Sequence, residues 1–240
     1  MKKLILTTAV LALTAGVSFA DTIRMGTEGA YPPYNFINDN GEVDGFERDV
    51  GDELCARAEL TCEWVTTDWD SIIPNLQSGN YDLIIAGMSI TEERREVLAF
   101  TQNYIPPTAS AYIGLSDDID VSTAVISAQT GTIQAAHVAQ SGATLLEFAN
   151  PDESVAAVRN GESDAVFADK DFLVPIQAES NGQFSFIGDD VPLGDGIGIG
   201  LRKSDTELKA KLDTAIGSMK DDGSLNVLIK KWFGEDAITY

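Results

Sequence analysis

Two side chains of opposite charge stand at positions from which they could bind a small molecule. Arg94 lies shortly after one apolar run, and Asp169 directly follows another at 164–168. A guanidinium binds a carboxylate through two parallel hydrogen bonds, and a carboxylate attracts an ammonium group. Because one cation and one anion are the minimum receptor for a zwitterion, the pair predicts a site for an amino acid.

Polar groups near Arg94 point to the same chemistry. Ser89 offers a hydroxyl, and Thr91 is placed to cap a helix that carries Arg94. A second turn contains Thr132 and Ile133, whose amides would point from a helix start toward an anion. The alternative for the first of these segments is an ordinary capped helix with a surface arginine.

Aromatic and acidic residues near other predicted strand ends could hold a side chain. Tyr31 follows the first predicted strand and Trp69 precedes a helix, so their rings could enclose an aliphatic group or a cation. Glu28 and Glu47 are the acids that could reach a distal basic group. The alternative is that the rings are core residues, which is the usual place for aromatic side chains.

Catalytic motifs are absent from the sequence. It has no Gly-x-Ser-x-Gly, no His-Glu-x-x-His, no phosphate-binding loop and no Gly-x-Gly-x-x-Gly after a strand. The one histidine, His137, falls inside a predicted helix, so acid–base chemistry would rest on carboxylates alone. We expect a binding protein, not an enzyme, with no cofactor and no metal site.

Residues 1–20 have the pattern of a secretory signal peptide. Two lysines precede an apolar run, and the small side chains of Ser18 and Ala20 precede a cleavage point. The run is shorter than the roughly 20 residues of a membrane-spanning helix, which argues against an anchor. We therefore expect export to the periplasm.

Charge and cysteine content fit an exported chain. The formal net charge of −22 would repel nucleic acid and anionic lipid, so we expect no nucleic-acid partner and no insertion into a membrane. Cys55 and Cys62 are the only cysteines. An oxidising compartment favours a disulfide between them.

Apolar runs alternate with amphipathic ones, which predicts an α/β fold. The last helix but one is expected to have Ser204 as its N-cap. We predict strands at 22–27, 62–66, 83–86, 111–115, 124–128, 145–148, 164–168 and 197–202, and helices at 46–58, 71–77, 132–140, 153–159, 172–179, 204–220 and 224–233.

An internal echo indicates two similar units. The segments 79–86 and 161–168 match in register, each with Gly in its first position, Asp in its fourth and an apolar strand after it. The same pattern is common in unrelated αβ connections. Ligands of open α/β sheets bind at the carboxyl ends of strands, so the residues just past these two strands are candidates for the site.

The final strand and helices indicate that the chain returns to the first unit. We expect crossings at 104–107, which prolines stiffen, and at 193–196, where glycines permit bending. The expected domains are a signal peptide at 1–20, a first lobe at 21–105 plus 193–240, and a second lobe at 106–192.

Further motifs extend over essentially the whole mature chain. They are residues 26–28 with 31–34, 45–47, 72–74, 89–91 with Arg94, 131–132, 198–203 and 231–234, together with Cys55, Cys62 and Asp169. This set resembles the polar amino acid binding proteins of ABC importers, solute-binding proteins of family 3, and most of all their lysine-arginine-ornithine and histidine branch. The resemblance implies a periplasmic binding protein-like fold, with two α/β lobes, a two-stranded hinge and a ligand cleft between the lobes.

The resemblance also implies roles for the charged pair. Arg94 would bind the α-carboxylate, assisted by Ser89 and the amides of Thr132 or Ile133. Asp169 would bind the α-ammonium group. These assignments agree with the receptor expected from the residue types alone.

The rest of the implied site contacts the ligand's side chain. Tyr31 and Trp69 would stack on it, and Glu28 and Glu47 stand where related proteins have aspartate. The sequence departs from the family in one place: members that bind basic amino acids often have serines at the positions of Ala86 and Gly87. Both positions are included in the predicted site.

The expected function is that of a monomeric periplasmic receptor. It would capture an L-amino acid with a basic side chain, such as arginine, lysine, ornithine or histidine, and deliver it to a membrane ABC permease. Two alternatives stay open. One is a binder of a neutral polar amino acid such as glutamine, and the other is a periplasmic enzyme similar to cyclohexadienyl dehydratase.

Overall fold

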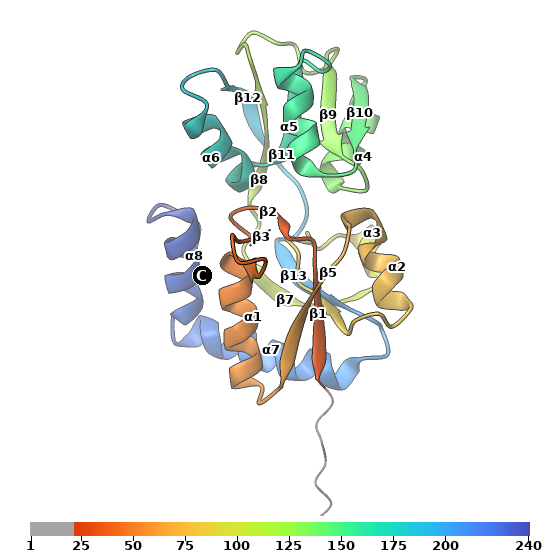
Figure 1. The fold of residues 1–240 in the computed structure, drawn as a ribbon, viewed down its shortest axis with the longest axis vertical. Helices are drawn as coiled ribbons and strands as arrows, with labels where there is room; N and C mark the ends of the chain where they lie inside the picture. Colours follow the sequence, from red (N-terminus) through yellow and green to blue (C-terminus); the bar gives the residue numbers. More distant parts are fainter. Residues whose placement is uncertain (1–21) are drawn as a thin grey trace, which may run out of the picture.

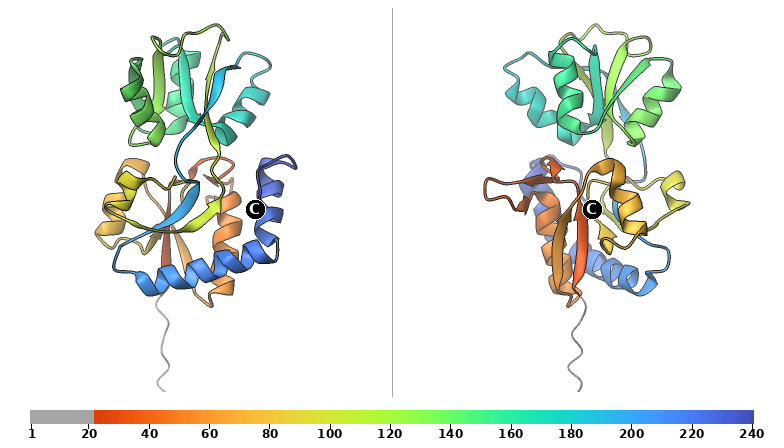
Figure 2. Two further views of the ribbon diagram at one scale, coloured as in Figure 1. Left: turned by 180° about the vertical axis from the view of Figure 1, so that it is seen from behind. Right: turned by 45° about the vertical axis from the view of Figure 1, so that its right-hand side comes forward.

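The computed structural model describes residues 22–240, so the predicted signal peptide lies outside the described residues. Two α/β lobes lie one above the other, each built on a five-stranded sheet (Figure 1). Two extended segments connect them (Figure 2). The predicted fold class is therefore confirmed.

The first lobe contains the start and the end of the described chain. Its strands are β1 (Ile23–Thr27), β5 (Cys62–Thr66), β6 (Leu83–Ile84), β7 (Ala99–Ile105) and β13 (Ile197–Leu201), in the order β5-β1-β6-β13-β7. β1 is parallel to β5 and β6, whereas the returning strand β13 is antiparallel to β6 and β7. The helices are α1 (Phe46–Arg57), α2 (Ile72–Gln77), α3 (Glu92–Arg95), α7 (Thr206–Asp221) and α8 (Ser224–Phe233).

The second lobe is continuous in sequence. Its strands are β8 (Ala109–Gly114), β9 (Val125–Gln129), β10 (Thr144–Phe148), β11 (Ala165–Asp169) and β12 (Ser185–Pro192), in the order β10-β9-β11-β8-β12. Its helices are α4 (Ile133–Ser141), α5 (Pro151–Arg159) and α6 (Lys170–Glu179). β9 is parallel to β10 and β11, as β1 is to β5 and β6, so the two sheets share one core arrangement.

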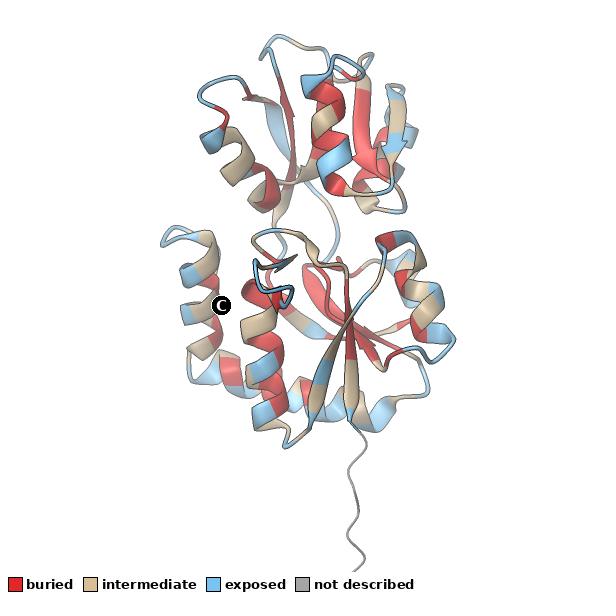
Figure 3. Ribbon diagram, viewed as in Figure 1, coloured by how far each residue is buried: buried red, intermediate tan, exposed pale blue. Residues whose placement is uncertain are grey.

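Apolar residues at helical spacing fix the helices against the sheets. Phe46, Val50 and Leu54 recur every four residues along α1 and are buried in one core. Ile72 and Leu76 of α2 are buried in a separate core of the same lobe. Buried residues accordingly lie in the strands and on the inward faces of the helices (Figure 3), as expected for a sheet covered on both faces.

The internal echo marks equivalent places in the two lobes. The Asp82 amide donates to Arg24 O at 2.8 Å, and Asp82 Oδ2 accepts from the Arg24 amide at 3.0 Å. Asp164 makes the same two bonds to Val125, both at 2.8 Å. The echo therefore reflects a real structural correspondence, in which each aspartate ties the turn before a strand to the adjacent parallel strand, β1 in the first sheet and β9 in the second.

The chain crosses between the lobes twice. It passes to the second sheet between Ile105 and Ala109, and returns between Pro192 and Ile197. The Asn103 side chain of β7 donates to Asp195 O at 3.0 Å and so links the end of β7 to the returning crossing. The positions along them at which one lobe ends stay a prediction.

Several elements differ from the sequence-based expectation. β7, β12 and a small sheet of β2 (Ala30–Tyr31), β3 (Asn35–Ile37) and β4 (Val43–Asp44) are additional, and β12 carries exposed acidic residues that hide its strand pattern. The expected N-cap at Ser204 is wrong. Asp205 directly precedes α7, and the Ser204 hydroxyl donates to that carboxylate at 2.9 Å instead of capping the helix.

The structure also bears on the expected disulfide and on the question of a membrane span. Cys55 and Cys62 form the expected disulfide, which joins the end of α1 to the start of β5. Among residues 22–240, no helix combines the length and the apolar character needed to cross a bilayer.

Candidate functional site

A pocket lies where strand ends of both sheets meet. It contains about 510 Å³ of empty space, which includes space open to solvent. Its walls come from the residues that follow β1, β5 and β6 in the first lobe and from the ends of β9 and β11 in the second. The predicted residues that line it are Glu28, Tyr31, Trp69, Ala86, Gly87, Ser89, Arg94, Thr132, Ile133 and Asp169.

Arg94 is held in place by its own short helix. The Thr91 hydroxyl accepts from the Arg94 amide at 3.1 Å and caps α3, which confirms the expected cap. The guanidinium donates to Ser89 O at 2.8 Å and to Gly131 O of the other lobe at 3.4 Å, and lies 5.4 Å from the Trp69 ring centroid. Burial lowers the pKa of Arg94 to about 10, so the group stays cationic at neutral pH.

Asp169 is the last residue of β11, and each of its carboxylate oxygens accepts a hydrogen bond. Tyr31 from the first lobe donates its hydroxyl to Oδ2 at 2.8 Å, and Gln134 of α4 donates to Oδ1 at 3.0 Å. Burial raises the pKa of Asp169 to about 6, partly offset by the Tyr31 bond. The Tyr31 ring stacks on Phe172 at 4.3 Å between centroids, so one of its faces is already covered.

Glu28 is the second acid of the pocket. Its Oε1 accepts from Gln129 Nε2 of the second lobe at 2.6 Å. Burial raises its pKa to about 7, and the charges of Asp68 and Asp152 act in the same direction. A cationic group placed beside Glu28 would relieve this cost by favouring the ionised form.

Glu47 does not line the pocket, which differs from the expectation. It is fully buried at the start of α1, where Oε2 accepts from Asn35 at 2.7 Å and Oε1 accepts from the Gly87 amide at 2.6 Å and from the Tyr104 hydroxyl. Both carboxylate oxygens are therefore bound inside the lobe, and the bond from the Gly87 amide fixes the 86–89 loop on the side away from the pocket. Gly87 has φ of +61°, a conformation that favours glycine.

The turn before α4 brings backbone groups to the pocket. The Thr132 hydroxyl accepts from the Ala135 amide at 3.1 Å and caps α4. This leaves the first amides of the helix, beginning at Ile133, without partners from the helix itself. Such amides can bind an anion.

Eight lining residues were not among the predicted ones: Gln129, Gln134, Pro151, Ser154, Val166, Phe167, Ala168 and Phe172. Gln129 and Gln134 flank the turn that contains Thr132, so both were near predicted site residues, but nothing in the sequence pointed to a neutral amide as a lining group. Phe172 follows Asp169 by three residues, and only the fold brings its ring against Tyr31.

The charges of the pocket do not cancel. Among the described residues that line it, the charged ones are Glu28, Arg94 and Asp169. When all three are ionised, the pocket carries one excess negative charge. This charge is complementary to a molecule with one carboxylate and two cationic groups.

Comparison with known protein families agrees with this architecture. Residues 23–235 match the family model of bacterial extracellular solute-binding proteins, family 3. The chain belongs to this family.

Individual relatives are similar over nearly their whole length. The chain is 31% identical to the lysine/arginine/ornithine-binding periplasmic protein of Escherichia coli K12, covering 97% of each sequence. A periplasmic His/Glu/Gln/Arg/opine family-binding protein from Silicibacter pomeroyi, crystallised in complex with lysine, is 72% identical, with a TM-score of 0.90 over 91% of this chain and all of that one. An ancestral arginine-binding protein, solved with arginine and with glutamine, is 32% identical, with a TM-score of 0.83 over 89% of this chain and 98% of that one.

Proposed function

We propose that the protein is a periplasmic receptor for an L-amino acid with a basic side chain, which it delivers to a membrane ABC permease. The proposed ligands are lysine, arginine, ornithine and histidine. The proposal includes export by a signal peptide at 1–20, a monomeric state and no catalytic activity. The first lobe would comprise 21–105 plus 193–240, and the second 106–192.

The charge pattern of the pocket is the observation that carries this proposal. Arg94, with Ser89 and the first amides of α4, would bind the α-carboxylate, and Asp169 would bind the α-ammonium group. Glu28 has no cationic partner among the described residues and is destabilised as an anion. A basic side chain would supply the missing positive charge.

The relatives support the same ligand class. The Silicibacter pomeroyi protein was crystallised with lysine, and the Escherichia coli relative is named for lysine, arginine and ornithine. The ancestral protein accepted glutamine as well as arginine, so glutamine is the second candidate ligand. Glutamine has a neutral side chain, which is compatible with a pocket in which Glu28 is protonated and therefore also neutral.

The test is a binding screen with purified protein. Isothermal calorimetry and thermal melting would be run with the common L-amino acids, after the protein has been unfolded and refolded to remove bound ligand. We expect lysine, arginine, ornithine or histidine to release heat and to raise the melting temperature, because a ligand that binds only the folded state stabilises it. If no amino acid on the panel does either, the proposed function is wrong.

A further inference from the structure

Gln129 spans the cleft at one end of the pocket. It ends β9 of the second lobe and is buried. Its Nε2 donates to Ala149 O at 3.1 Å within the same lobe and to Glu28 Oε1 of the first lobe at 2.6 Å. Both hydrogens of the amide nitrogen are therefore used, one to fix the side chain and one to reach the opposite lobe.

The bond to Glu28 exists only while the lobes are close together. Glu28 follows β1 and Gln129 ends β9, so separating the lobes would break it. The strength of the bond depends on the charge of Glu28, since a hydrogen bond to an ionised carboxylate is about twice as strong as one between neutral groups. A nearby cation in turn favours the ionised form of Glu28, whose charge is disfavoured by burial and by two nearby acids.

We propose that Gln129 is a specificity-determining residue, whose bond to Glu28 stabilises the closed lobes most strongly around a ligand with a cationic side chain. This inference rests on the proposed function and deepens it. Beside a ligand with a neutral side chain, Glu28 is mostly protonated at a pH below about 7, and the same bond then contributes less to closure. The discrimination is made by the strength of this bond between the lobes.

Gln134 provides a matched control in the same lobe. It is also a buried glutamine that donates to a pocket carboxylate, but that carboxylate is Asp169. In the proposed function Asp169 binds the α-ammonium group, which every amino acid has. Removing the Gln134 amide should therefore affect all amino acids alike.

The experiment compares the affinities of lysine and glutamine in Gln129→Met and Gln134→Met at about pH 6.5, below the pKa of about 7 that Glu28 has without ligand. Lysine is measured by calorimetry and glutamine by displacement of lysine, which also reaches weak affinities. We expect Gln129→Met to weaken lysine binding about 10- to 100-fold and glutamine binding at most about fivefold. Gln134→Met should weaken both by the same factor.

A second pair of variants tests the mechanism. In a Glu28→Gln background, Gln129→Met should change lysine and glutamine binding equally, because no charge is left to strengthen the bond. Circular dichroism and melting curves check folding, and Gln129→Asn, which keeps an amide but is too short to reach Glu28, replaces Gln129→Met if that variant does not fold. Equal losses for both ligands in Gln129→Met, or an undiminished lysine effect without Glu28, would overturn the inference. Wild-type protein that binds no amino acid of the calorimetry and melting panel would instead overturn the proposed function.

Discussion

At the scale of single residues, the site depends on where a few charges are buried. Arg94 and Asp169 were predicted from their positions after strands, and the structure brings both to one pocket. Glu47 shows what such reasoning misses. In the sequence it resembles Glu28, an acid near an aromatic residue, but burial in α1 directs its carboxylate to the Gly87 amide and away from the pocket. Only tertiary packing distinguishes the two acids.

The Arg94 guanidinium is expected to contribute most to binding. Arg94→Ala should weaken binding of every amino acid ligand by about 2 to 5 kcal/mol, because the desolvated α-carboxylate loses its charged partner. Arg95→Ala is the matched control, since Arg95 is the next residue of α3 and pairs only distantly with Glu92, at 3.8 Å. Calorimetry on both variants checks this. Unchanged affinity in Arg94→Ala would show that Arg94 does not bind the α-carboxylate.

Affinity for a basic ligand is expected to rise with pH. Burial raises the pKa of Glu28 to about 7 and that of Asp169 to about 6, and a dicationic ligand favours the ionised form of both. Binding therefore releases protons when the pH lies below these values. Lysine affinity should rise at least about tenfold between about pH 5 and about pH 8 and then level off. Glu28→Gln should remove the part of the rise nearest pH 7, and an unchanged profile in that variant would contradict the assignment.

At the scale of elements, the sequence predicted most strands and helices because apolar runs and cap residues mark them. Asn150 and Pro151 are start signals that the prediction did not use: Asn150 caps α5, which begins at Pro151, two residues before the predicted start. β7 and β12 could not be found in this way. Polar side chains such as Gln102 and Asp189 interrupt their apolar pattern, and the pairing of each strand is set by a partner far away in the sequence.

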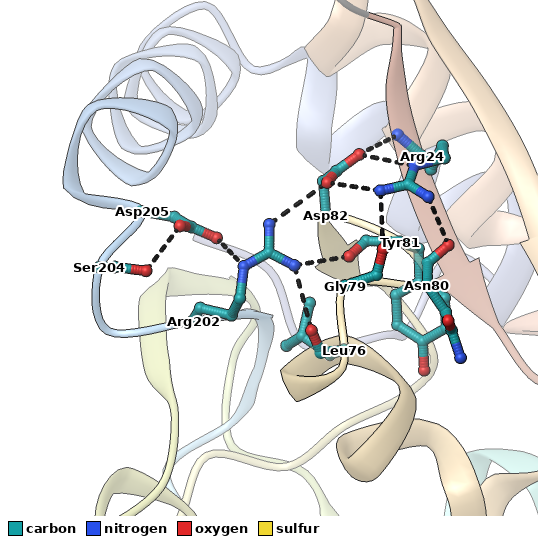
Figure 4. A network of polar contacts seen from close by, with 9 residues as sticks. All are labelled: Arg24, Leu76, Gly79, Asn80, Tyr81, Asp82, Arg202, Ser204 and Asp205. Atoms are coloured by element: carbon teal, nitrogen blue, oxygen red, sulfur yellow. Dashed lines mark hydrogen bonds and ion pairs between the residues drawn. The ribbon is translucent and has the colours of Figure 1, made fainter.

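A polar network anchors the returning strand of the first lobe. Asp82 accepts from the Arg24 guanidinium at 3.1 Å and from Arg202, which follows β13, at 3.2 Å; Arg202 also pairs with Asp205 (Figure 4). Burial alone would raise the pKa of Asp82, but the bonds from Arg24 and Arg202 outweigh it and lower the pKa. The network lies at the amino end of β6, opposite to the pocket. It should therefore affect folding and leave binding unchanged.

Neutralising Asp82 tests the network. Asp82→Asn should lower the free energy of unfolding by about 1 to 2 kcal/mol at neutral pH, whereas Asp164→Asn, whose wild-type carboxylate accepts only a backbone amide, should cost less. Because the folded-state pKa of Asp82 is lowered, its contribution is present above the unfolded-state pKa and is lost as the pH falls through the folded-state value. Urea titrations at neutral and acidic pH check this. Equal losses in both variants, or a loss that persists in acid, would contradict it.

At the scale of the whole molecule, direct contacts hold the lobes together around the pocket. Besides the bonds of Gln129 and Tyr31, the Tyr34 hydroxyl donates to Asp171 of the second lobe at 3.2 Å. Tyr34 does not line the pocket. These contacts mean that the balance between open and closed lobes is set by the protein as well as by the ligand.

Removing one such contact should open the ligand-free protein. Tyr34→Phe should weaken all ligands by the same factor, about threefold to tenfold, because a smaller fraction of the protein is in the binding-competent form. Small-angle scattering should show a larger radius of gyration without ligand and the wild-type value with it. Tyr81→Phe, which removes a bond to Ile72 O inside the first lobe, should change neither quantity. A ligand-dependent change in affinity for Tyr34→Phe would argue against a closure effect.

A crystal structure of the protein in complex with lysine would test most directly which pocket residues bind each charged group of the ligand. We expect the α-carboxylate within hydrogen-bonding distance of Arg94, the α-ammonium group at Asp169 and the side-chain amine beside Glu28, with the Gln129 bond kept. A lysine bound with its carboxylate away from Arg94, or with its amine away from Glu28, would contradict the claim that opposite charges from two lobes select this ligand.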